Sequence, residues 1–452
     1  MAKRFGTDGV RGVANTVLTP ELAFDLGRAG AYVLARHKAA GEKIRILVGK
    51  DTRLSGDLLA NALLAGILSV GADAYLVDVV PTPAVAWLTL HQSLEAGVMI
   101  SASHNPAADN GIKFFACDGC KLPDELEDEI EYWLDHSHQL PRPAGDQVGR
   151  VHHVFHWSEL YVDYLANLAT VPSFHDLHVV LDCANGAAFQ VAPTLFTRLG
   201  IRTEVINAAP NGLNINVECG STHPNALSQK VQEVGADLGL AFDGDADRLI
   251  AVDHEGRVVN GDAIMAICAL ALKAEGHLTN DLLVTTVMSN LGLEKAMEAA
   301  GIRLLRTQVG DRYVLAAMQE AGASLGGEQS GHIIFLDHAT TGDGVLTALK
   351  LVEIVAKNGM SLADLAAVVK PYPQVLLNVP VANRDILQEV AVTQAIQQAE
   401  QMMQGQGRLL VRPSGTEPVI RVMAEAATET LAETAVQLVA RVIEQVNEQE
   451  GK

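Results

Sequence analysis

Short apolar runs alternate with longer amphipathic stretches in the first third of the chain. Apolar runs at 44–48 and 74–80 predict buried strands, and the stretch at 56–70 has the apolar spacing of a helix. Another helix is predicted to begin at Thr19-Pro20, because Thr is a typical N-cap and Pro a typical first helical residue. This alternation predicts a mostly parallel sheet that helices cover on both faces.

The same alternation recurs in two later parts of the chain. One part has predicted strands at 179–181 and 238–242, and the next has a predicted strand at 283–287 between helices at 261–273 and 310–318. Each part is predicted to be an α/β unit. Three units of similar size favour an internal structural repeat, although no residue-level period is evident.

The last part of the chain has a different character. Predicted strands at 375–379 and 409–411 flank a helix, a third strand follows at 419–423, and a closing helix spans 427–446. The predicted fold is therefore α/β with four domains, in which three similar α/β units with mixed, mostly parallel sheets precede a smaller α+β domain. The predicted domains span 1–152, 153–255, 256–370 and 371–452.

Composition narrows the classes of protein that fit this pattern. With 452 residues the chain is too long for one core, and its 48% hydrophobic and 19% charged residues are ordinary for a soluble, well-packed protein. The net charge of −21 argues against a nucleic-acid or anionic-membrane partner, because such binding needs clustered Lys and Arg. An acidic protein that handles anionic substrates must concentrate its basic residues locally.

The N-terminus and the cysteines both favour a cytoplasmic protein. No apolar signal region follows Met1, and the longest uninterrupted apolar run, 263–272, is about half the length that spans a membrane. The five cysteines form no even disulfide framework. Cys117 and Cys120 have the CxxC spacing of redox and zinc sites, but the Asp-Gly between them is typical of a hairpin turn.

The most concentrated chemistry lies in one short segment near position 100. The apolar run 97–100 predicts a strand that ends in the polar loop Ser-Ala-Ser-His-Asn-Pro at 101–106, and open α/β sheets bind ligands at such strand ends. Ser103, His104 and Lys113 place a hydroxyl, an imidazole and an ammonium close together in the sequence. A turn whose side chains hydrogen-bond their own backbone would explain the same residues, so the loop alone leaves both interpretations open.

Three carboxylates follow a predicted strand at alternate positions. Asp243, Asp245 and Asp247 are separated by small residues and can converge on one hard cation through oxygen ligands. A calcium EF-hand does not fit, because its sixth position would be Arg248 instead of Gly and its twelfth His254 instead of Glu. An acidic turn without a cation is the alternative, but three unpaired carboxylates would repel one another.

Two glycine-containing loops offer further polar groups. Glu328 and Ser330 lie beside glycines that interrupt an apolar segment, so a ligand can approach the backbone closely, although a hairpin is the alternative. The loop 412–418 and the strand after it bring together hydroxyls, a glycine amide and a guanidinium group, which suit an oxyanion. These oxyanion candidates are Ser414, Gly415, Thr416 and Arg421. A turn-rich loop without a ligand is the alternative.

Two arginines and a group of histidines are weaker candidates. Arg11 lies in the glycine-rich segment 6–12 and Arg53 follows a predicted strand, so each is a candidate phosphate contact or a solvated surface residue. The segment 141–149 is rich in Pro and Gly and predicts a linker. The histidines around it fit no metal-site spacing and are expected to be solvated.

The loop 101–106 resembles the active-serine loop of the alpha-D-phosphohexomutase superfamily, in the form most similar to its phosphoglucosamine mutases. The segments Asp-Gly-Asp-Ala-Asp-Arg, Gly-Glu-Gln-Ser-Gly and Arg-Pro-Ser-Gly-Thr-Glu-Pro follow in the order of that family, so the resemblance covers essentially the whole chain. Gln329, between Glu and Ser, is again the phosphoglucosamine-mutase-like form, whereas mannose and glucose mutases tend to carry a different residue there.

The resemblance implies a role for each loop. Ser103 would carry a phosphoryl group and pass it to and from the substrate, with Lys113 as electrostatic or acid–base partner. One Mg²⁺ per chain is implied on Asp243, Asp245 and Asp247, with the Ser103 phosphate supplying a further oxygen. The implied catalytic set also includes Arg11, His104 and His332. The implied substrate contacts are Glu328 and Ser330 for sugar hydroxyls, and Arg412, Ser414, Gly415, Thr416 and Arg421 for the non-reacting phosphate.

The activity implied by the resemblance is the interconversion of glucosamine 6-phosphate and glucosamine 1-phosphate, through a phosphoserine enzyme and a sugar bisphosphate that also serves as primer. A phosphoglucomutase or phosphomannomutase would share every catalytic part. A non-catalytic phosphosugar-binding protein is the remote alternative, against which Lys113 and His332 argue because binding alone needs no acid–base groups. The expected partner is a phosphosugar substrate, with neither nucleic acid nor membrane, and the assembly considered is a homodimer.

Overall fold

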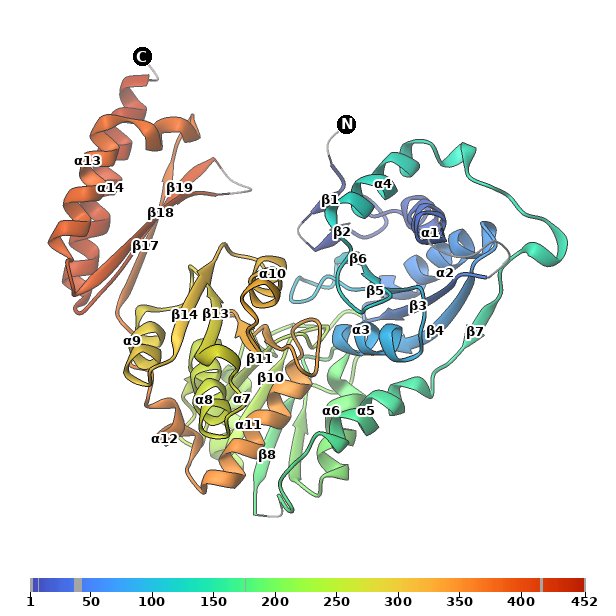
Figure 1. Ribbon diagram of the computed structural model, residues 1–452, viewed down its shortest axis with the longest axis horizontal. Coiled ribbons are helices and arrows are strands. Elements are labelled where there is room, and N and C mark those ends of the chain that lie inside the picture. The colour runs from blue at the N-terminus through green and yellow to red at the C-terminus, as the bar shows by residue number, and fades with distance from the viewer. Residues whose placement is uncertain (1–2, 7, 36–42, 175, 415–417, 451–452) are drawn as a thin grey trace. The chain divides into compact units, whose positions relative to one another are not determined.

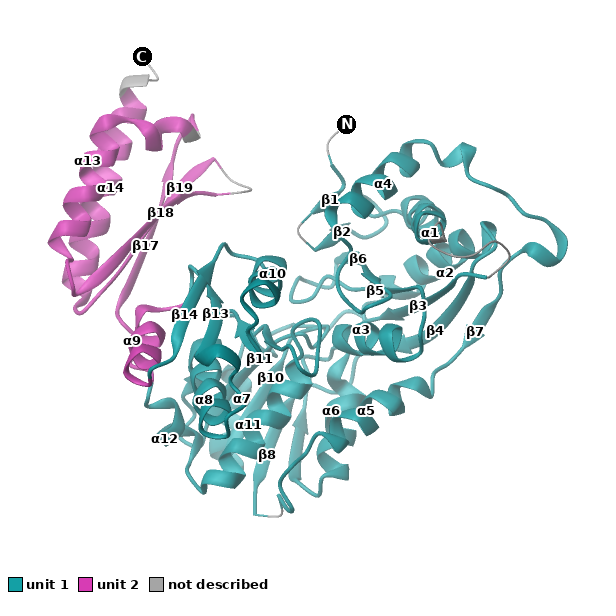
Figure 2. Ribbon diagram, in the orientation of Figure 1, with its two compact units in different colours: residues 1–288, 301–368 teal, residues 289–300, 369–452 magenta. Residues whose placement is uncertain are grey.

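The computed structural model describes residues 3–450 except for residues 7, 36–42, 175 and 415–417 (Figure 1). The chain forms two compact units, which Figure 2 colours separately. Unit 1 comprises residues 1–288 and 301–368, and unit 2 comprises residues 289–300 and 369–452.

Unit 1 begins with a seven-stranded mixed sheet. Its strand order is β1 (Phe5–Gly6), β2 (Gly9–Val13), β6 (Asp109–Ala116), β5 (Ala96–Ile100), β3 (Arg45–Lys50), β4 (Asp73–Val79) and β7 (Val151–His153). Neighbours from β5 to β7 are parallel, and the pairs that involve β1, β2 and β6 are antiparallel. Because every residue of β5 is buried, the strand that leads into the serine loop is covered on both faces.

Helices cover this first sheet on both faces (Figure 1). Helices α1 (Pro20–Ala35), α2 (Ser55–Ser69) and α4 (Asp124–Asp135) share one apolar core with β3, β5 and β6. Helix α3 (Thr82–His91) packs on the opposite face, where Val85 lies so close to Gly49 and Gly97 that neither strand position has room for a side chain. The parallel strands and their helices confirm the predicted α/β character of this region.

Two further sheets complete unit 1. The second has the order β12 (Val258–Val259), β11 (Leu249–Asp253), β10 (Leu238–Phe242), β8 (His178–Asp182) and β9 (Arg202–Ile206), with helices α5 (Trp157–Asn167), α6 (Ala188–Arg198) and α7 (Asn225–Val234). The third has the order β14 (Arg303–Thr307), β13 (Leu282–Thr286), β15 (Leu325–Gly327) and β16 (Ile333–Phe335), with helices α8 (Gly261–Ala274) and α10 (Asp311–Ala321). Helix α11 (Gly344–Asn358) packs on α8 and on β10 and β11 of the second sheet, and helix α12 (Leu362–Ala366) packs on α8. Both sheets are mixed, with antiparallel pairs after a parallel centre.

Unit 2 is the smaller α+β part of the chain. Its sheet has the order β17 (Gln374–Pro380), β19 (Val419–Ala426) and β18 (Gly407–Pro413), and all its pairs are antiparallel. Helices α13 (Val390–Met402) and α14 (Glu429–Glu450) form one apolar core with this sheet. Helix α9 (Leu291–Ala299) also belongs to unit 2, because the backbone N–H of Leu291 donates to Glu425 Oε2 at 2.8 Å. The predicted fold class is confirmed.

Short segments outside these elements bear on the sequence predictions. Among the described residues, 3-10 turns lie at Ser137–Gln139, Gly145–Gln147, Thr279–Asp281 and Arg384–Gln388. The CxxC segment forms the predicted turn, in which the Gly119 N–H donates to the Ala116 carbonyl and Phe115 pairs with Lys121. All five cysteines are free, and burial raises the pKa of the Cys120 thiol to about 11, so this thiol stays protonated at neutral pH.

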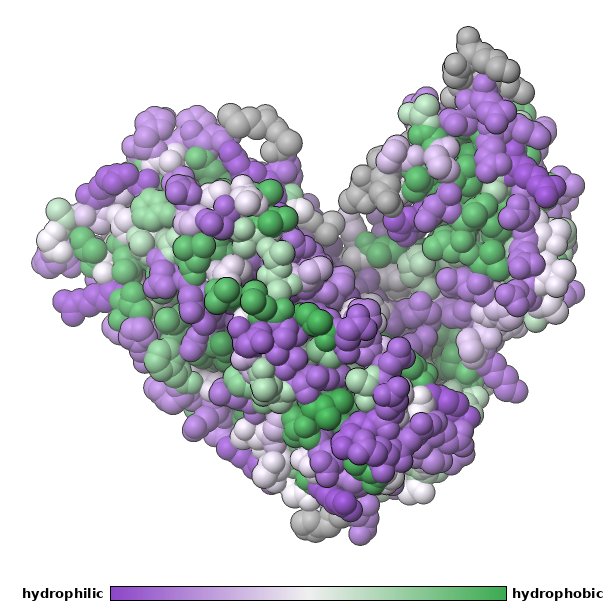
Figure 3. All heavy atoms as spheres, turned by 180° about the vertical axis from the view of Figure 1, so that it is seen from behind, coloured by the Kyte–Doolittle hydropathy of each residue, from purple (hydrophilic) through white to green (hydrophobic). Residues whose placement is uncertain are grey.

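The surface fits the composition of the chain. On the face drawn in Figure 3, hydrophilic residues predominate and hydrophobic residues lie among them in small groups. Within the part of the chain that the structure describes, none of the helices combines the length and apolar character needed to cross a membrane.

Candidate active site

Ser103 lies in the loop that follows β5, and hydrogen bonds to other side chains hold this loop in place. Its side chain is buried, and its φ of 52° lies in the left-handed region that residues other than glycine rarely adopt. The Ser103 N–H donates to Ser101 Oγ at 3.0 Å, and the Ser101 hydroxyl donates to Asp51 Oδ2 at 2.6 Å. Such over-determined, strained positions are typical of functional sites.

Arg53 supports this loop from within the protein. Its guanidinium pairs with Asp51 at 2.8 Å and donates to the carbonyls of Ser103 at 2.8 Å and Asn105 at 2.9 Å, and also to those of Pro106 and Asp109. Arg53 is 2% exposed, so these partners leave it no approach to a ligand. The sequence hypothesis of a phosphate contact at Arg53 is therefore wrong, because a basic residue after a strand can equally bind the backbone of a neighbouring loop.

We expect Arg53→Met to lower the free energy of unfolding by about 3–5 kcal/mol, because the substitution leaves the buried Asp51 carboxylate without its ion partner. Denaturant titration monitored by circular dichroism measures the loss. Lys230→Met is the control, since it removes an ion pair with Glu233 at the surface, where such pairs contribute about 0–1 kcal/mol. Equal losses in the two variants would contradict the supporting role of Arg53.

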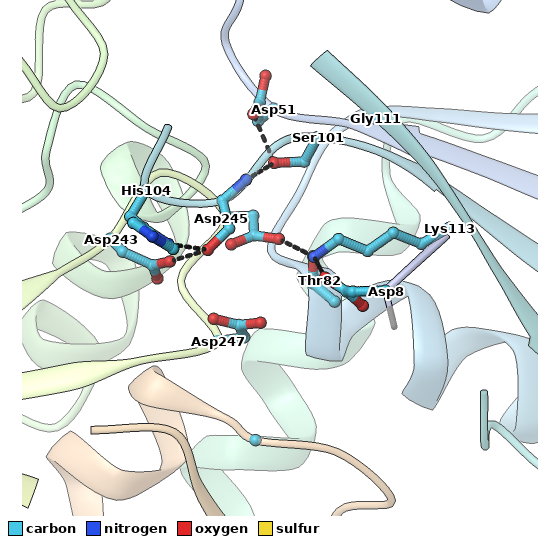
Figure 4. A network of polar contacts seen from close by, with 12 residues as sticks. Asp8, Asp51, Thr82, Ser101, His104, Gly111, Lys113, Asp243, Asp245 and Asp247 are labelled. Carbon is cyan, nitrogen blue, oxygen red and sulfur yellow. Dashed lines mark hydrogen bonds and ion pairs between the residues drawn. The ribbon is translucent and has the colours of Figure 1, made fainter. Parts of the chain in front are cut away.

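The three predicted carboxylates lie near one another in the site (Figure 4). Asp243, Asp245 and Asp247 are buried, and one ligand oxygen from each lies within 4.8 Å of the others. The Ser103 hydroxyl donates to Asp243 Oδ2 at 2.6 Å. A side chain at Gly244 would approach the Ser103 carbonyl oxygen to 2.5 Å, so glycine at this position lets the two loops touch.

This cluster has the properties of a site for a hard divalent cation. Buried oxygens of Asp245 and Asp247 accept no hydrogen bond from the described residues. Burial and the two neighbouring carboxylates raise the pKa of Asp243 well above its usual range, and burial and Asp245 raise the pKa of Asp247. A cation bound by these oxygens would remove both penalties, and an all-carboxylate donor set suits Mg²⁺ or Ca²⁺.

Lys113 lies on β6 beside the cluster and is ionised by its surroundings. Its ammonium is 2.8 Å from Asp245 Oδ2 and 3.1 Å from Asp8 Oδ2. Burial alone would lower the pKa of Lys113, but these carboxylates outweigh burial and raise it. The same contact, with a 2.6 Å hydrogen bond from the Thr82 hydroxyl, keeps the pKa of Asp245 below its usual range against the effect of burial. Lys113 therefore offers a permanent positive charge.

His104 is the imidazole nearest to the serine. Its Nδ1 lies 3.3 Å from Ser103 Oγ. Burial, together with the charges of Arg248 and Arg11, lowers the pKa of His104 to about 4. The ring is therefore neutral at physiological pH and can take or give a hydrogen bond at the serine oxygen without adding charge.

The loop that contains Glu328 and Ser330 places Glu328 close to His332. The Glu328 N–H donates to the His332 carbonyl at 2.9 Å, and Glu328 Oε1 accepts the Gly310 N–H at 3.2 Å. The buried His332 accepts the Gly342 N–H at Nε2 (3.2 Å). Ser330 is exposed in the same loop. Arg248 pairs with His332 in a short β-bridge, which joins this loop to the carboxylate loop.

Two of the residues expected to bind the non-reacting phosphate, Arg412 and Arg421, lie on adjacent strands of unit 2. Arg412 on β18 is directly opposite Arg421 on β19, so the two guanidinium groups share one face of the sheet. Burial and the charge of Arg421 lower the pKa of Arg412. Ser414 follows β18 and is buried. Gly415 and Thr416 lie outside the described residues. A pair of arginines on one face is suited to bind a phosphate.

Sequence reasoning missed two groups that contact the carboxylate loop or its lysine. Thr82 donates from its hydroxyl to Asp245, as described above, and from its N–H to the Asp245 carbonyl at 2.9 Å. Asp8 pairs with Lys113 and also with Arg11, the predicted arginine of the glycine-rich segment. For Asp8 a signal was available, because it lies beside Arg11 in the same segment. Thr82 carries no such signal, since only the folded chain brings it to position 245.

Comparison with known proteins places the chain in a family. It matches the domains of phosphoglucomutase/phosphomannomutase over most of its length: alpha/beta/alpha domain I at residues 2–140, domain II at 159–256, domain III at 260–372 and the C-terminal domain at 376–442. The match at 376–442 covers most of the sheet of unit 2 with helix α13 and most of α14, whereas helix α9 lies within the match to domain III.

Individual relatives narrow the assignment. The chain is 55% identical over 427 residues to a phosphoglucosamine mutase of Desulforamulus reducens, covering 94% of this chain and 95% of the relative. A crystal structure of a phosphoglucomutase/phosphomannomutase family protein from Burkholderia thailandensis is 23% identical, with a TM-score of 0.82 and 98% of both chains covered. The N-acetylphosphoglucosamine mutase of Aspergillus fumigatus, solved with GlcNAc-6P and magnesium, is 17% identical with a TM-score of 0.66, covering 98% of this chain and 96% of that one. The four matched domains and the full-length identity show that the chain belongs to the phosphoglucosamine mutases, isomerases of the phosphohexomutase superfamily.

Proposed function

We propose that the chain interconverts glucosamine 6-phosphate and glucosamine 1-phosphate, with Ser103 as the residue that carries the phosphoryl group. The observation that carries this proposal is the contact of the Ser103 hydroxyl with Asp243 at 2.6 Å, inside a buried cluster of three carboxylates. In phosphoryl transfer, a cation next to the reacting oxygen neutralises charge on the phosphoryl group. Ser103 beside the carboxylate cluster fits this arrangement.

The reaction has two transfers of the same kind. The bond from phosphorus to Ser103 Oγ breaks as a bond to a hydroxyl of the sugar monophosphate forms, which gives a sugar bisphosphate. The bisphosphate then turns around, and the bond between the sugar oxygen and its original phosphate breaks as a bond from that phosphorus to Ser103 Oγ forms. Each sugar hydroxyl that is phosphorylated loses a proton, and the sugar oxygen released in the second transfer gains one. A sugar bisphosphate is also the primer expected to charge Ser103.

The residues around Ser103 are proposed to have different roles in the transfer, according to their charge. Asp243, Asp245 and Asp247 would hold one Mg²⁺, which neutralises charge on the transferring group when it is bound. The fungal relative solved with magnesium supports this choice of metal. Lys113, whose ammonium is 2.8 Å from Asp245 Oδ2, would be the electrostatic or acid–base partner of the transfer. His104 lies at the serine oxygen as a neutral ring.

Substrate contacts are proposed for the loops described above. Glu328 and Ser330 would bind sugar hydroxyls, and His332 and Arg11 would lie near the phosphoryl group. Arg412, Ser414, Gly415, Thr416 and Arg421 would bind the phosphate that does not react. Because either phosphate of the bisphosphate fits the same group of cations and amides, one phosphate site can serve both orientations.

The test of this function is turnover of glucosamine 6-phosphate with Mg²⁺ and a trace of glucosamine 1,6-bisphosphate, compared with the glucose and mannose phosphates. The proposal expects the highest kcat/KM for the glucosamine phosphate. A higher kcat/KM for glucose or mannose phosphate would change the substrate while leaving the serine mechanism in place.

We expect Arg421→Ala to weaken glucosamine and glucose 6-phosphates alike, because the two substrates share the phosphate and differ only at C2. The loss in kcat/KM should correspond to about 1.5–3 kcal/mol, the contribution of one charged hydrogen bond.

Glu328→Ala should lower kcat/KM more for the amino sugar than for glucose 6-phosphate, since a carboxylate near C2 would favour the ammonium group. Measurement of kcat/KM for both sugars in both variants decides, and equal losses in Glu328→Ala would move the selectivity elsewhere, first to the region of Asp311 and Arg312.

A further inference from the structure

A row of alternating charges connects the carboxylate cluster with His332. We call it the charge row, and it consists of Asp245, Lys113, Asp8, Lys121 and Asp311 in that order. Lys121 forms ion pairs with both Asp8 and Asp311. At the far end, Asp311 Oδ2 lies 3.7 Å from His332 Nε2.

The backbone explains how distant segments meet in the charge row. A side chain at Gly9 would approach the Ile112 carbonyl oxygen to 2.3 Å, so glycine there lets the segment of Asp8 lie directly on β6 beside Lys113. Lys121 follows the turn after β6, and Asp311 is the first residue of α10. The row therefore connects the first sheet with a helix of the third sheet, and all its members belong to unit 1.

The charges of the row balance and are held in ionised form. Its three carboxylates face three cations, because Arg11 also pairs with Asp8. Burial opposes ionisation, but Lys113, Lys121 and Arg11 keep the pKa of Asp8 well below its usual range, and Lys121 and His332 lower the pKa of Asp311. Burial would likewise lower the pKa of Lys121, but Asp311 and Asp8 raise it. Removing one member leaves its neighbours as unbalanced charges in a largely buried environment.

We propose that Asp8, Lys121 and Asp311 are positioning residues for phosphoryl transfer, which hold Lys113 at the carboxylate cluster and His332 at the opposite end in a fixed geometry. This inference rests on the roles proposed above for Lys113 and His332. None of the three positioning residues contacts Ser103, so each acts through its neighbour in the row. Lys121 is expected to matter most, because it pairs with Asp311, from which 190 positions of the sequence separate it.

Lys121→Met is the central test, because it keeps the length of the side chain and removes its charge. Lys121 borders a cavity of about 510 Å³, so the methionine has room to pack. We expect kcat to fall about 100-fold, as when reacting groups are misplaced by about 1 Å, with KM within about threefold of wild type, which marks a loss confined to the transition state. Lys121→Arg keeps the charge and should restore most of kcat.

Lys350→Met is the matched control. Lys350 is also a lysine of unit 1 in an ion pair, with Glu353 at 3.1 Å, and its side chain is 17% exposed against 20% for Lys121. It lies outside the charge row, so kcat should stay at the wild-type value. If Lys121→Met and Lys350→Met change kcat equally, or if Lys121→Arg is as slow as Lys121→Met, the positioning role is refuted.

A second set of variants removes dependence on the folding of Lys121→Met. Asp311→Asn and Asp8→Asn keep side-chain size, and each should lower kcat in protein that thermal melting shows to be folded at the assay temperature. Adding Lys121→Met to either should lower kcat by less than it does in wild type, because the row is already broken; full additivity of the losses would refute the row. Ser103→Ala, assayed in parallel, separates the hypotheses: activity in Ser103→Ala defeats the proposed serine mechanism, whereas an inactive Ser103→Ala with wild-type kcat in Asp311→Asn and Lys121→Met defeats the charge row alone.

Discussion

Ser103→Ala is expected to lose mutase turnover completely and to keep its fold. The substitution removes one oxygen from a buried loop side chain, and no other hydroxyl in the described part of the loop contacts Asp243. The Ser103 hydroxyl donates one hydrogen bond to a charged group, so the variant should lose at most about 1.5–3 kcal/mol of stability. The left-handed backbone at 103 is available to alanine as to serine, because both side chains meet the backbone through the same Cβ.

Two measurements check this expectation. Intact-mass and phosphopeptide analysis should find a phosphate on Ser103 in active wild-type protein and none in the variant. Turnover of glucosamine 6-phosphate should fall to the level of a sample without enzyme. Wild-type turnover in Ser103→Ala would remove the serine from the mechanism.

Ser101→Ala is the matched control for the serine loop. Ser101 is a buried serine two residues away, and its hydroxyl joins the Ser103 N–H to Asp51. Its loss should slow the reaction by loosening the loop, but phosphate should still be found on Ser103. Complete inactivity of Ser101→Ala with an unphosphorylated Ser103 would mean that the whole loop, rather than one hydroxyl, is needed for transfer.

Local sequence patterns predicted the parts of the site that depend on short-range geometry. A buried strand that ends in a cluster of polar turn formers places Ser103 at the end of that strand, and three carboxylates at alternate positions after a strand lie close together in the structure, as their spacing predicted. The predicted strand and helix ranges were accurate for the same reason, because apolar periodicity is set by the element itself.

Contacts that span the sequence were not predictable in this way. The sequence around Arg53 would look the same whether its guanidinium bound a phosphate or four backbone carbonyl groups. Only the folded loop shows that it binds the carbonyls. Helix α9 has an ordinary amphipathic sequence, which predicts a helix but not that its first residue binds Glu425 in unit 2. The antiparallel pairs of β1 and β2 also escaped prediction, because strands of two and five residues carry little periodicity.

Chelation of divalent metal is expected to abolish activity, and Asp245→Asn should lower it by about 10²–10³-fold, the loss typical for one preorganised electrostatic group. Asparagine keeps the size of the side chain and removes one of three charges, so the cation is held less tightly. Turnover is measured against Mg²⁺ concentration after treatment with a chelator. An unchanged rate without metal would show that the carboxylate cluster is structural.

Stability in the absence of metal distinguishes Asp245 from Asp247. The lowered pKa of Asp245 means that its charge stabilises the fold through Lys113, whereas the raised pKa of Asp247 means that its charge is unfavourable there. At neutral pH with chelator, Asp245→Asn should therefore lower the melting temperature, and Asp247→Asn should raise it. Both variants should nevertheless lose activity, because each substitution removes one of the three negative charges that would hold the cation. Thermal melts of the two variants with and without Mg²⁺ test these opposite changes in melting temperature. If both melting temperatures change in the same direction without metal, the proposed effects of the two charges are wrong.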